Sequence, residues 1–226
     1  MNTPTSIIFL GATGAVGGEA LKRALTLPAV DLITLLGRRD VEGLTHAAVR
    51  QIKVDVKDAV SFEKSVGPHD VAICTLGIGQ PSKVTDEQFV AIDKTAVLNF
   101  ARACKSAGVK HFQLLASVGV SATSSTFYLR IKGELVEELK ALNFDRLSIF
   151  KPSMILTPTN RYGWKQGLTL KVWPILNPLF FGGMKQYRGV KVETLGSAFI
   201  GNMNTEGSGY EELTWVNFQE LGRFVI

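Results

Sequence analysis

The chain has 226 residues, 46% of them hydrophobic, which is enough for one domain with a well-formed core. Its formal net charge of +5 comes from scattered basic residues, so we expect no nucleic-acid partner. Cys74 and Cys104 form no disulfide framework, and no histidine or cysteine cluster has metal-binding spacing, which excludes the common zinc sites and favours a reducing, cytoplasmic location.

The amino terminus and the most apolar late segment predict neither a leader nor a membrane span. The first strand begins at about residue 6, which leaves no room for a signal or transit peptide before it. Residues 168–184 are apolar but contain Lys171, Pro174 and Pro178, so we expect them to pack against the core. A contact with a membrane surface is the less favoured alternative.

A glycine-rich turn follows the first predicted strand. Glycines recur every third residue from 11 to 17, and a helical pattern begins at about residue 15 and continues to 26. Without side chains the turn can close, a pyrophosphate can approach the backbone, and the amides at the helix start favour an anion. No G-K-[ST] follows, which excludes a P-loop. The alternative is a loop that serves only strand–helix packing. The predicted cofactor-binding residues of this turn are Gly11, Thr13, Gly14, Ala15, Val16 and Gly17.

Two arginines follow the second predicted strand, residues 32–36. In a dinucleotide-binding fold this strand ends near the adenosine ribose, where an acidic residue binds the free 2′-hydroxyl. Arg38 and Arg39 can instead neutralise a 2′-phosphate, which favours NADP(H) over NAD(H). Asp40 comes one position too late to be a strong signal for NAD(H). A pair of solvated arginines is the alternative.

The third and fourth predicted strands, residues 51–54 and 70–74, supply further candidate contacts with the cofactor. Asp55 and Val56 follow the third strand and are predicted to face the adenine. Asp55 either accepts a hydrogen bond from the adenine or caps the helix that begins at about residue 58. Leu76 and Gly77 follow the fourth strand, where the backbone runs beside the cofactor and Gly77 allows a close approach.

One long helix is predicted over residues 86–107, with Gly108 as its stop. We expect Asp93 and Asn99 on this helix to be solvent or packing residues rather than catalysts. The fifth strand is predicted over residues 111–116. Ser117 therefore lies at its carboxyl end, at the edge where open parallel sheets bind their ligands.

Tyr128 and Lys132 lie four residues apart on the next predicted helix, so they share one face. An ammonium group near a tyrosine stabilises the deprotonated form and makes the hydroxyl a better acid or base. Ser117 can bind a substrate oxygen from the adjacent strand end. Together the three residues predict a site that protonates a carbonyl oxygen while a hydride reaches its carbon. The alternatives are a pair that only positions the cofactor and a pair without a catalytic role.

The regular pattern fades after the sixth predicted strand, residues 145–150. We expect residues 1–155 to form a dinucleotide-binding domain. Residues 156–226 are expected to form a small lobe that covers the substrate and is integral to the same domain. Four aromatic residues are candidate walls of the substrate pocket, although such residues more often belong to a core. They are Trp164, Trp173, Phe181 and Tyr187.

Several segments together resemble the atypical short-chain dehydrogenase/reductase superfamily, and within it the small NAD(P)-binding proteins of the Tat-interacting-protein-like, NmrA-like oxidoreductase group. The resemblance is strong over residues 6–155, and its segments are GATGAVGG, LLGRR, VDVKD, CTLG, KHFQLLASVG and YLRIKGELVEEL. It implies an α/β fold, a doubly wound Rossmann-type parallel sheet with strand order 3-2-1-4-5-6. It also implies bound NADP(H), and Ser117, Tyr128 and Lys132 as the acting residues, with Lys132 also holding the cofactor ribose.

The expected function is an NADP(H)-dependent oxidoreductase for a small carbonyl or alcohol substrate. The chain departs from the group at residues 151–152, where Lys-Pro replaces a frequent Arg-Pro, and Ser121 competes with Ser117 for the serine role. One alternative is a regulatory or sensor protein that binds NADP(H) with little or no turnover, as some NmrA-like relatives do. Another is an epimerase that retains its cofactor. A homodimer or a protein partner is compatible with each of these functions.

Overall fold

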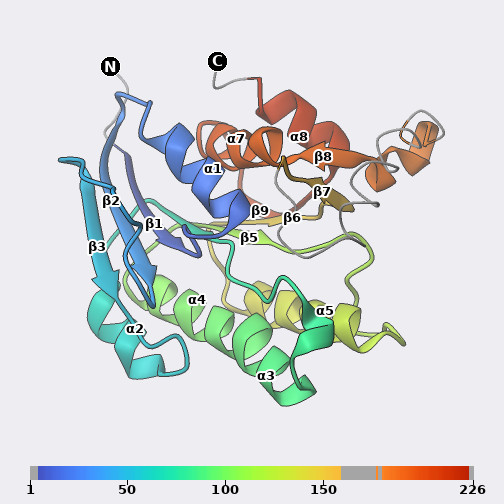
Figure 1. The fold of residues 1–226 in the computed structure, drawn as a ribbon, viewed down its shortest axis with the longest axis horizontal. Coiled ribbons are helices and arrows are strands. Elements are labelled where there is room, and N and C mark those ends of the chain that lie inside the picture. The colour runs from blue at the N-terminus through green and yellow to red at the C-terminus, as the bar shows by residue number, and fades with distance from the viewer. Residues whose placement is uncertain (1–4, 159–176, 178–179, 224–226) are drawn as a thin grey trace.

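The computed structural model describes residues 5–158, 177 and 180–223 (Figure 1). Its centre is a seven-stranded sheet in which all neighbouring strands are parallel, in the order β3-β2-β1-β4-β5-β6-β9. The predicted doubly wound sheet and its strand order are confirmed, and one further strand extends it. The strands are β1 (Thr5–Leu10), β2 (Val30–Gly37), β3 (Val49–Lys53), β4 (Val71–Cys74), β5 (His111–Leu115), β6 (Arg146–Phe150) and β9 (Gly209–Leu213).

Helices cover both faces of the sheet, which explains why the residues of its central strands are buried on both sides. Every residue of β4 and of β6 is buried. Figure 1 shows one layer of helices above the sheet and another below it, and a hydrophobic core fills the space on each side. The first layer holds α1 (Ala15–Ala24), α7 (Val192–Met203) and α8 (Trp215–Leu221), and the second holds α2 (Ala59–Ser65), α4 (Val97–Ser106) and α5 (Phe127–Ala141).

The predicted single α-helix over residues 86–107 is wrong in its middle. The chain forms α3 (Asp86–Val90), then a π-helical turn over Ala91–Ala96, and then α4. Gly108 ends this series at φ +84°, in the left-handed region that glycine adopts readily. A π-helical turn often marks a functional site because it redirects side chains within a helix.

The described residues after position 156 contain more regular structure than their pattern indicates. Strand β9 pairs with β6, and α7 packs closely on α1, where a Cβ at Gly196 would lie 2.6 Å from the Cβ of Glu19. A separate two-stranded sheet joins β7 (Met154–Leu156) to β8 (Gly189–Lys191). No helix among the residues described has the length and apolar character needed to cross a bilayer.

Two of the four candidate pocket walls, Trp164 and Trp173, lie outside the described residues. The other two are at the surface: Phe181 is 72% exposed and Tyr187 is 41% exposed. Neither contributes to the two cavities of the candidate active site described below.

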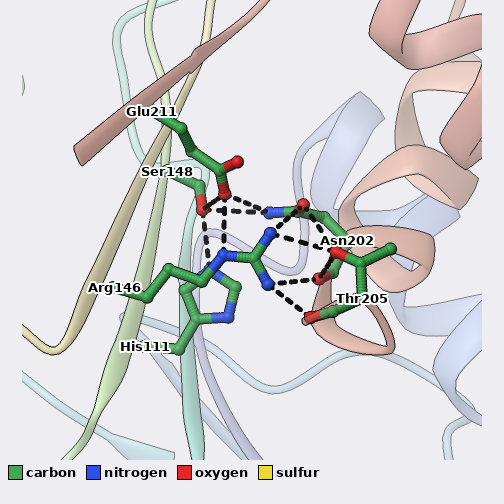
Figure 2. Close-up of polar contacts among 6 residues, drawn as sticks. All are labelled: His111, Arg146, Ser148, Asn202, Thr205 and Glu211. Carbon is green, nitrogen blue, oxygen red and sulfur yellow. Dashed lines mark hydrogen bonds and ion pairs between the residues drawn. The ribbon is translucent and has the colours of Figure 1, made fainter. Parts of the chain in front are cut away.

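A buried polar network fixes the seventh strand and the end of α7 to the amino ends of β5 and β6 (Figure 2). Arg146 donates hydrogen bonds to Glu211 at 2.8 Å and to the side-chain oxygen of Asn202 at 2.7 Å. The hydroxyl of Ser148 donates to Glu211 at 2.5 Å and lies 2.7 Å from Nε2 of His111. Burial, together with the Arg146 charge, lowers the pKa of His111 to about 3, so this histidine is neutral at pH 7.

Candidate active site

The glycine turn between β1 and α1 is packed directly against the backbone that follows β4. Gly11 has φ +102°, and a Cβ there would lie 2.6 Å from the backbone nitrogen of Leu76. A Cβ at Gly17 would lie 2.5 Å from Oγ1 of Thr75 and closer still to the carbonyl oxygen of Gly11. Both positions therefore require glycine, one for its backbone conformation and both for the close approach.

The start of α1 offers free backbone amides to a ligand. Gly14 precedes this ten-residue helix, and no side chain caps its first amides. The amide of Gly14 donates to the carbonyl oxygen of Gly11 at 2.9 Å, which holds the turn closed. Uncapped amides and the helix dipole favour an anion here, so the turn fits the pyrophosphate of a dinucleotide.

A cleft beside the turn runs along the carboxyl ends of β1, β2 and β3. Arg38 and Arg39 are exposed at its rim, and within the described part of the chain neither forms an ion pair. Asp40 also lines the cleft, but its carboxylate pairs with Lys53 at 3.2 Å. The other predicted cofactor-binding residues that line this cleft are Gly11, Thr13, Val56 and Leu76.

Asp55 does not cap the helix that follows it. Its carboxylate accepts a hydrogen bond from the amide of Lys57 at 2.9 Å, and the cap of α2 is Asp58, which accepts from Val60 at 3.0 Å. Asp55 is exposed and is not among the residues lining the cleft. A contact between Asp55 and the adenine stays a prediction.

Two further cavities meet at Tyr128. The first, of about 510 Å³, continues from the glycine turn: Leu76 lines both it and the cleft, and the remaining predicted residues that line it are Gly14, Ala15, Val16, Gly77 and Lys132. The second, of about 570 Å³, lies beyond Tyr128 and contains Ser117. Tyr128 borders both cavities. The tyrosine therefore stands between the candidate cofactor cavity and a second, substrate-sized cavity.

Ser117, rather than Ser121, contributes to the second cavity. Among the described residues, the Ser117 hydroxyl makes only long contacts, with the carbonyl oxygens of Val118 and Pro152 at 3.4 and 3.5 Å, so it is available to a ligand. Ser121 lies 2.9 Å from the hydroxyl of Thr123 and lines neither cavity. The geometry thus favours Ser117 of the two predicted serines.

Lys132 lies under the tyrosine and is held by a buried acid. Its ammonium nitrogen is 5.6 Å from the centre of the Tyr128 ring and 2.9 Å from Oδ1 of Asp93. The second carboxylate oxygen of Asp93 accepts from the amide of Ile78 at 2.8 Å. Burial alone would lower the pKa of Lys132, but the nearby Tyr128 and Asp93 outweigh it and raise this pKa above its ordinary value.

Of the two expectations for Asp93, a solvent residue or a packing residue, the first is wrong because the side chain is buried. Only 1% of its side chain is exposed, and it lies in the π-helical turn, facing Lys132. A Cβ at Gly77 would lie 3.0 Å from its Oδ1, so a larger residue at position 77 would press against this carboxylate. The spacing of Asp93, four residues from Phe89 and from Val97, which are both buried, indicates an inward-facing position, whereas its pairing with Lys132 depends on a distant segment.

Comparisons with known proteins show the family and the fold. Residues 11–144 match a family described as NAD(P)H-binding. The protein HTATIP2 of Rattus norvegicus is 34% identical over 210 residues, which cover 92% of this chain and 85% of that protein. The mitochondrial protein FMP52 of Meyerozyma guilliermondii is 36% identical over 152 residues, 66% of this chain and 64% of that protein.

Solved structures with the same fold are more distant in sequence. MoeE5 in complex with UDP-glucose and NAD has a TM-score of 0.70 at 14% identity, over 92% of this chain and 76% of that one. The Bordetella bronchiseptica enzyme WbmH in complex with NAD+ has a TM-score of 0.68 at 15% identity, over 93% and 75%. From its sequence match and its Rossmann-type sheet, the chain belongs to the family of NAD(P)H-binding proteins.

Proposed function

We propose that the protein is an NADP(H)-dependent oxidoreductase that acts on a small carbonyl or alcohol substrate through Ser117, Tyr128 and Lys132. The observation that carries this proposal is the position of Tyr128, which borders both the cavity next to the glycine turn and the cavity that contains Ser117. A proton donor between a cofactor site and a substrate site is the arrangement that carbonyl reduction needs.

The residues of this chain have distinct roles in the proposed reaction. A bound NADP(H) would supply hydride exchange with the substrate carbon. The Tyr128 hydroxyl donates a proton to the carbonyl oxygen during reduction and accepts it back during oxidation. The charged Lys132 stabilises the deprotonated tyrosine and binds the cofactor ribose, and Ser117 donates a hydrogen bond that orients the same substrate oxygen.

The proposed preference for NADP(H) rests on the rim of the first cleft. Arg38 and Arg39 lie there as exposed guanidinium groups without a carboxylate partner among the described residues, and a 2′-phosphate would supply one. Asp40 is the one acidic residue among the described residues that line this cleft, and its pairing with Lys53 leaves it less able to bind a ribose hydroxyl.

The test is the variant Tyr128→Phe, assayed by NADPH oxidation with a panel of small aldehydes and ketones. The variant retains the ring that packs on Phe89 at 5.4 Å between centres, so the fold is unchanged. We expect turnover to fall by about 10²- to 10⁴-fold while NADPH binding is retained. The matched control is Tyr210→Phe, since Tyr210 is a partly exposed tyrosine of β9 that borders neither cavity. Unchanged turnover in Tyr128→Phe would refute the proposal.

Two other outcomes of the same assay point to the alternative functions. Tight NADPH binding without oxidation of NADPH by any member of the panel would favour a regulatory protein that senses the dinucleotide. Turnover during which the cofactor stays bound and unchanged in net redox state would favour an epimerase. Either outcome contradicts the proposed oxidation of NADPH coupled to reduction of the substrate.

A further inference from the structure

The second cavity has an asymmetric charge. It is lined by apolar residues such as Pro152, Met154 and Ile155 and by the hydroxyls of Ser82, Ser117 and Ser153. Among the described residues that line it, Lys83 is the only charged one, and no carboxylate borders it. Asp93 is the acid among the described residues that line the neighbouring cavity, and it is paired with Lys132. From the described residues, a ligand in the second cavity therefore meets one positive charge and no opposing negative charge.

The backbone of Lys83 is held at the rim of this cavity. It ends a 3-10 helix, Pro81–Lys83, in which its amide donates to the carbonyl oxygen of Gln80 at 3.1 Å. Two residues later, Thr85 is the N-cap of α3 and forms a capping box, in which its hydroxyl accepts a hydrogen bond from the amide of Gln88 at 3.3 Å. Pro81 before Lys83 and the Thr85 cap after it restrict the backbone conformation of this segment. The backbone of Lys83 therefore has a fixed position at the rim of the cavity.

The ammonium of Lys83 is available to a ligand. Lys83 is exposed and forms no ion pair within the part of the chain that the structure describes, as is also true of Lys64 and Lys110, but Lys83 is the one of these three that borders the cavity. A lysine that borders a cavity without a carboxylate partner is suited to bind an anionic group of a ligand.

We infer that the substrate carries an anionic group, a carboxylate or a phosphate, which Lys83 binds while the reacting carbonyl lies between Ser117 and Tyr128. This inference rests on the proposed function and extends it, because it makes Lys83 a residue that determines specificity. A neutral substrate of the same shape would leave the ammonium without a partner and would bind more weakly.

Binding can be measured without turnover if the protein is first saturated with NADP+, because an oxo compound cannot be reduced by the oxidised cofactor. The probes are matched pairs: 2-oxo acids against their methyl esters, and dihydroxyacetone phosphate against dihydroxyacetone. In calorimetric titrations we expect the charged member of at least one pair to bind about tenfold more tightly. The pair that shows this difference identifies the anion as a carboxylate or a phosphate.

The variant Lys83→Gln tests the residue itself. It should remove most of that tenfold preference, and Lys83→Glu should reverse it in favour of the neutral member. The control is Lys64→Gln, because Lys64 is an exposed lysine of α2, a helix that lines neither cavity. The inference is overturned if no charged member is preferred, or if Lys83→Gln keeps the preference.

NADPH oxidation with the same pairs separates this inference from the proposed function. Preferred binding of the charged member without any NADPH oxidation would leave the anion site intact and refute the oxidoreductase. Oxidation of NADPH at equal rates by charged and neutral members, unchanged in Lys83→Gln, would support the oxidoreductase and refute the anion site. The expected result is a KM that rises about tenfold in Lys83→Gln for the charged member only, with kcat nearly unchanged.

Discussion

Asp93 and Lys132 form a buried ion pair, with 2.9 Å between the carboxylate and the ammonium and with 1% and 10% of the two side chains exposed. The pair joins the π-helical turn to α5 and fixes the ammonium beside the ring of Tyr128. Because both groups are desolvated, either one without the other would be an uncompensated charge in the interior.

The variant Asp93→Asn should therefore affect both stability and the pH dependence of turnover. We expect the free energy of unfolding to fall by about 3 kcal/mol, measured by denaturant titration. Asp93 helps to raise the pKa of Lys132, so its loss lowers that pKa and the ammonium loses its proton at a lower pH. The alkaline limb of the kcat profile should accordingly move to lower pH.

A surface pair provides the control for this variant. Glu137 and Lys140 lie 2.8 Å apart, but 60% and 37% of their side chains are exposed. Glu137→Gln should change the free energy of unfolding by less than about 1 kcal/mol and leave the pH profile as it was. Equal effects of the two variants would show that the buried pair has no special role.

Gly17 and Gly18 are neighbours on α1 and should respond oppositely to alanine. A Cβ at Gly17 would lie 2.5 Å from Oγ1 of Thr75, whereas one at Gly18 would lie 3.5 Å from the nearest atom, the carbonyl oxygen of Ala12. Gly17→Ala should lower the melting temperature and weaken NADPH binding by at least about tenfold, because the turn must open. Gly18→Ala should stabilise the helix by up to about 1 kcal/mol. Similar melting temperatures for the two variants would contradict this account.

The rim arginines should determine which dinucleotide binds. We expect NADPH to bind more tightly than NADH, and Arg38→Ala and Arg39→Ala each to weaken NADPH by about tenfold with little effect on NADH. The measurement is a fluorescence titration of both cofactors. The control is Arg102→Ala, since Arg102 lies on α4, which lines neither the cleft nor the cavities. Equal affinity for the two cofactors in the unaltered protein would refute a 2′-phosphate site.

His111 should make the fold sensitive to acid. Its pKa is about 3 in the folded protein and 6.5 ordinarily, so between these values the unfolded chain binds a proton that the folded chain does not. The free energy of unfolding then falls as the pH drops below about 6.5, by at most about 1.4 kcal/mol per pH unit from this residue.

The variant His111→Gln tests this dependence while keeping a polar atom near Ser148. Melting temperatures between pH 7 and pH 4 should fall less steeply in this variant than in the unaltered chain. His46 is exposed, so His46→Gln is the control and should reproduce the unaltered profile. An identical slope in His111→Gln would exclude this histidine as the cause.

The pattern of residues along the chain was enough to predict those parts of the fold that depend on residues close together in the sequence. The apolar run of β1, the glycine spacing that follows it, and the position of Arg38 and Arg39 after β2 are all short-range features. Ser117, Tyr128 and Lys132 could likewise be assigned to one end of the sheet, because the carboxyl ends of parallel strands share an edge.

Features that depend on contacts between distant segments were not predictable in this way. Strand β9 has the charged sequence GYEEL, and its place in the sheet depends on Glu211, which accepts from Arg146 at a separation of 65 residues. Asp93 has an ordinary helical spacing, and only the approach of α5 turns it into the partner of Lys132, 39 positions later. The sequence by itself therefore determined the order of the first six strands of the sheet and the glycine turn, since these follow from local spacing and strand polarity. Only the tertiary structure decided which charges are buried and paired, because pairing and desolvation depend on segments that meet after folding.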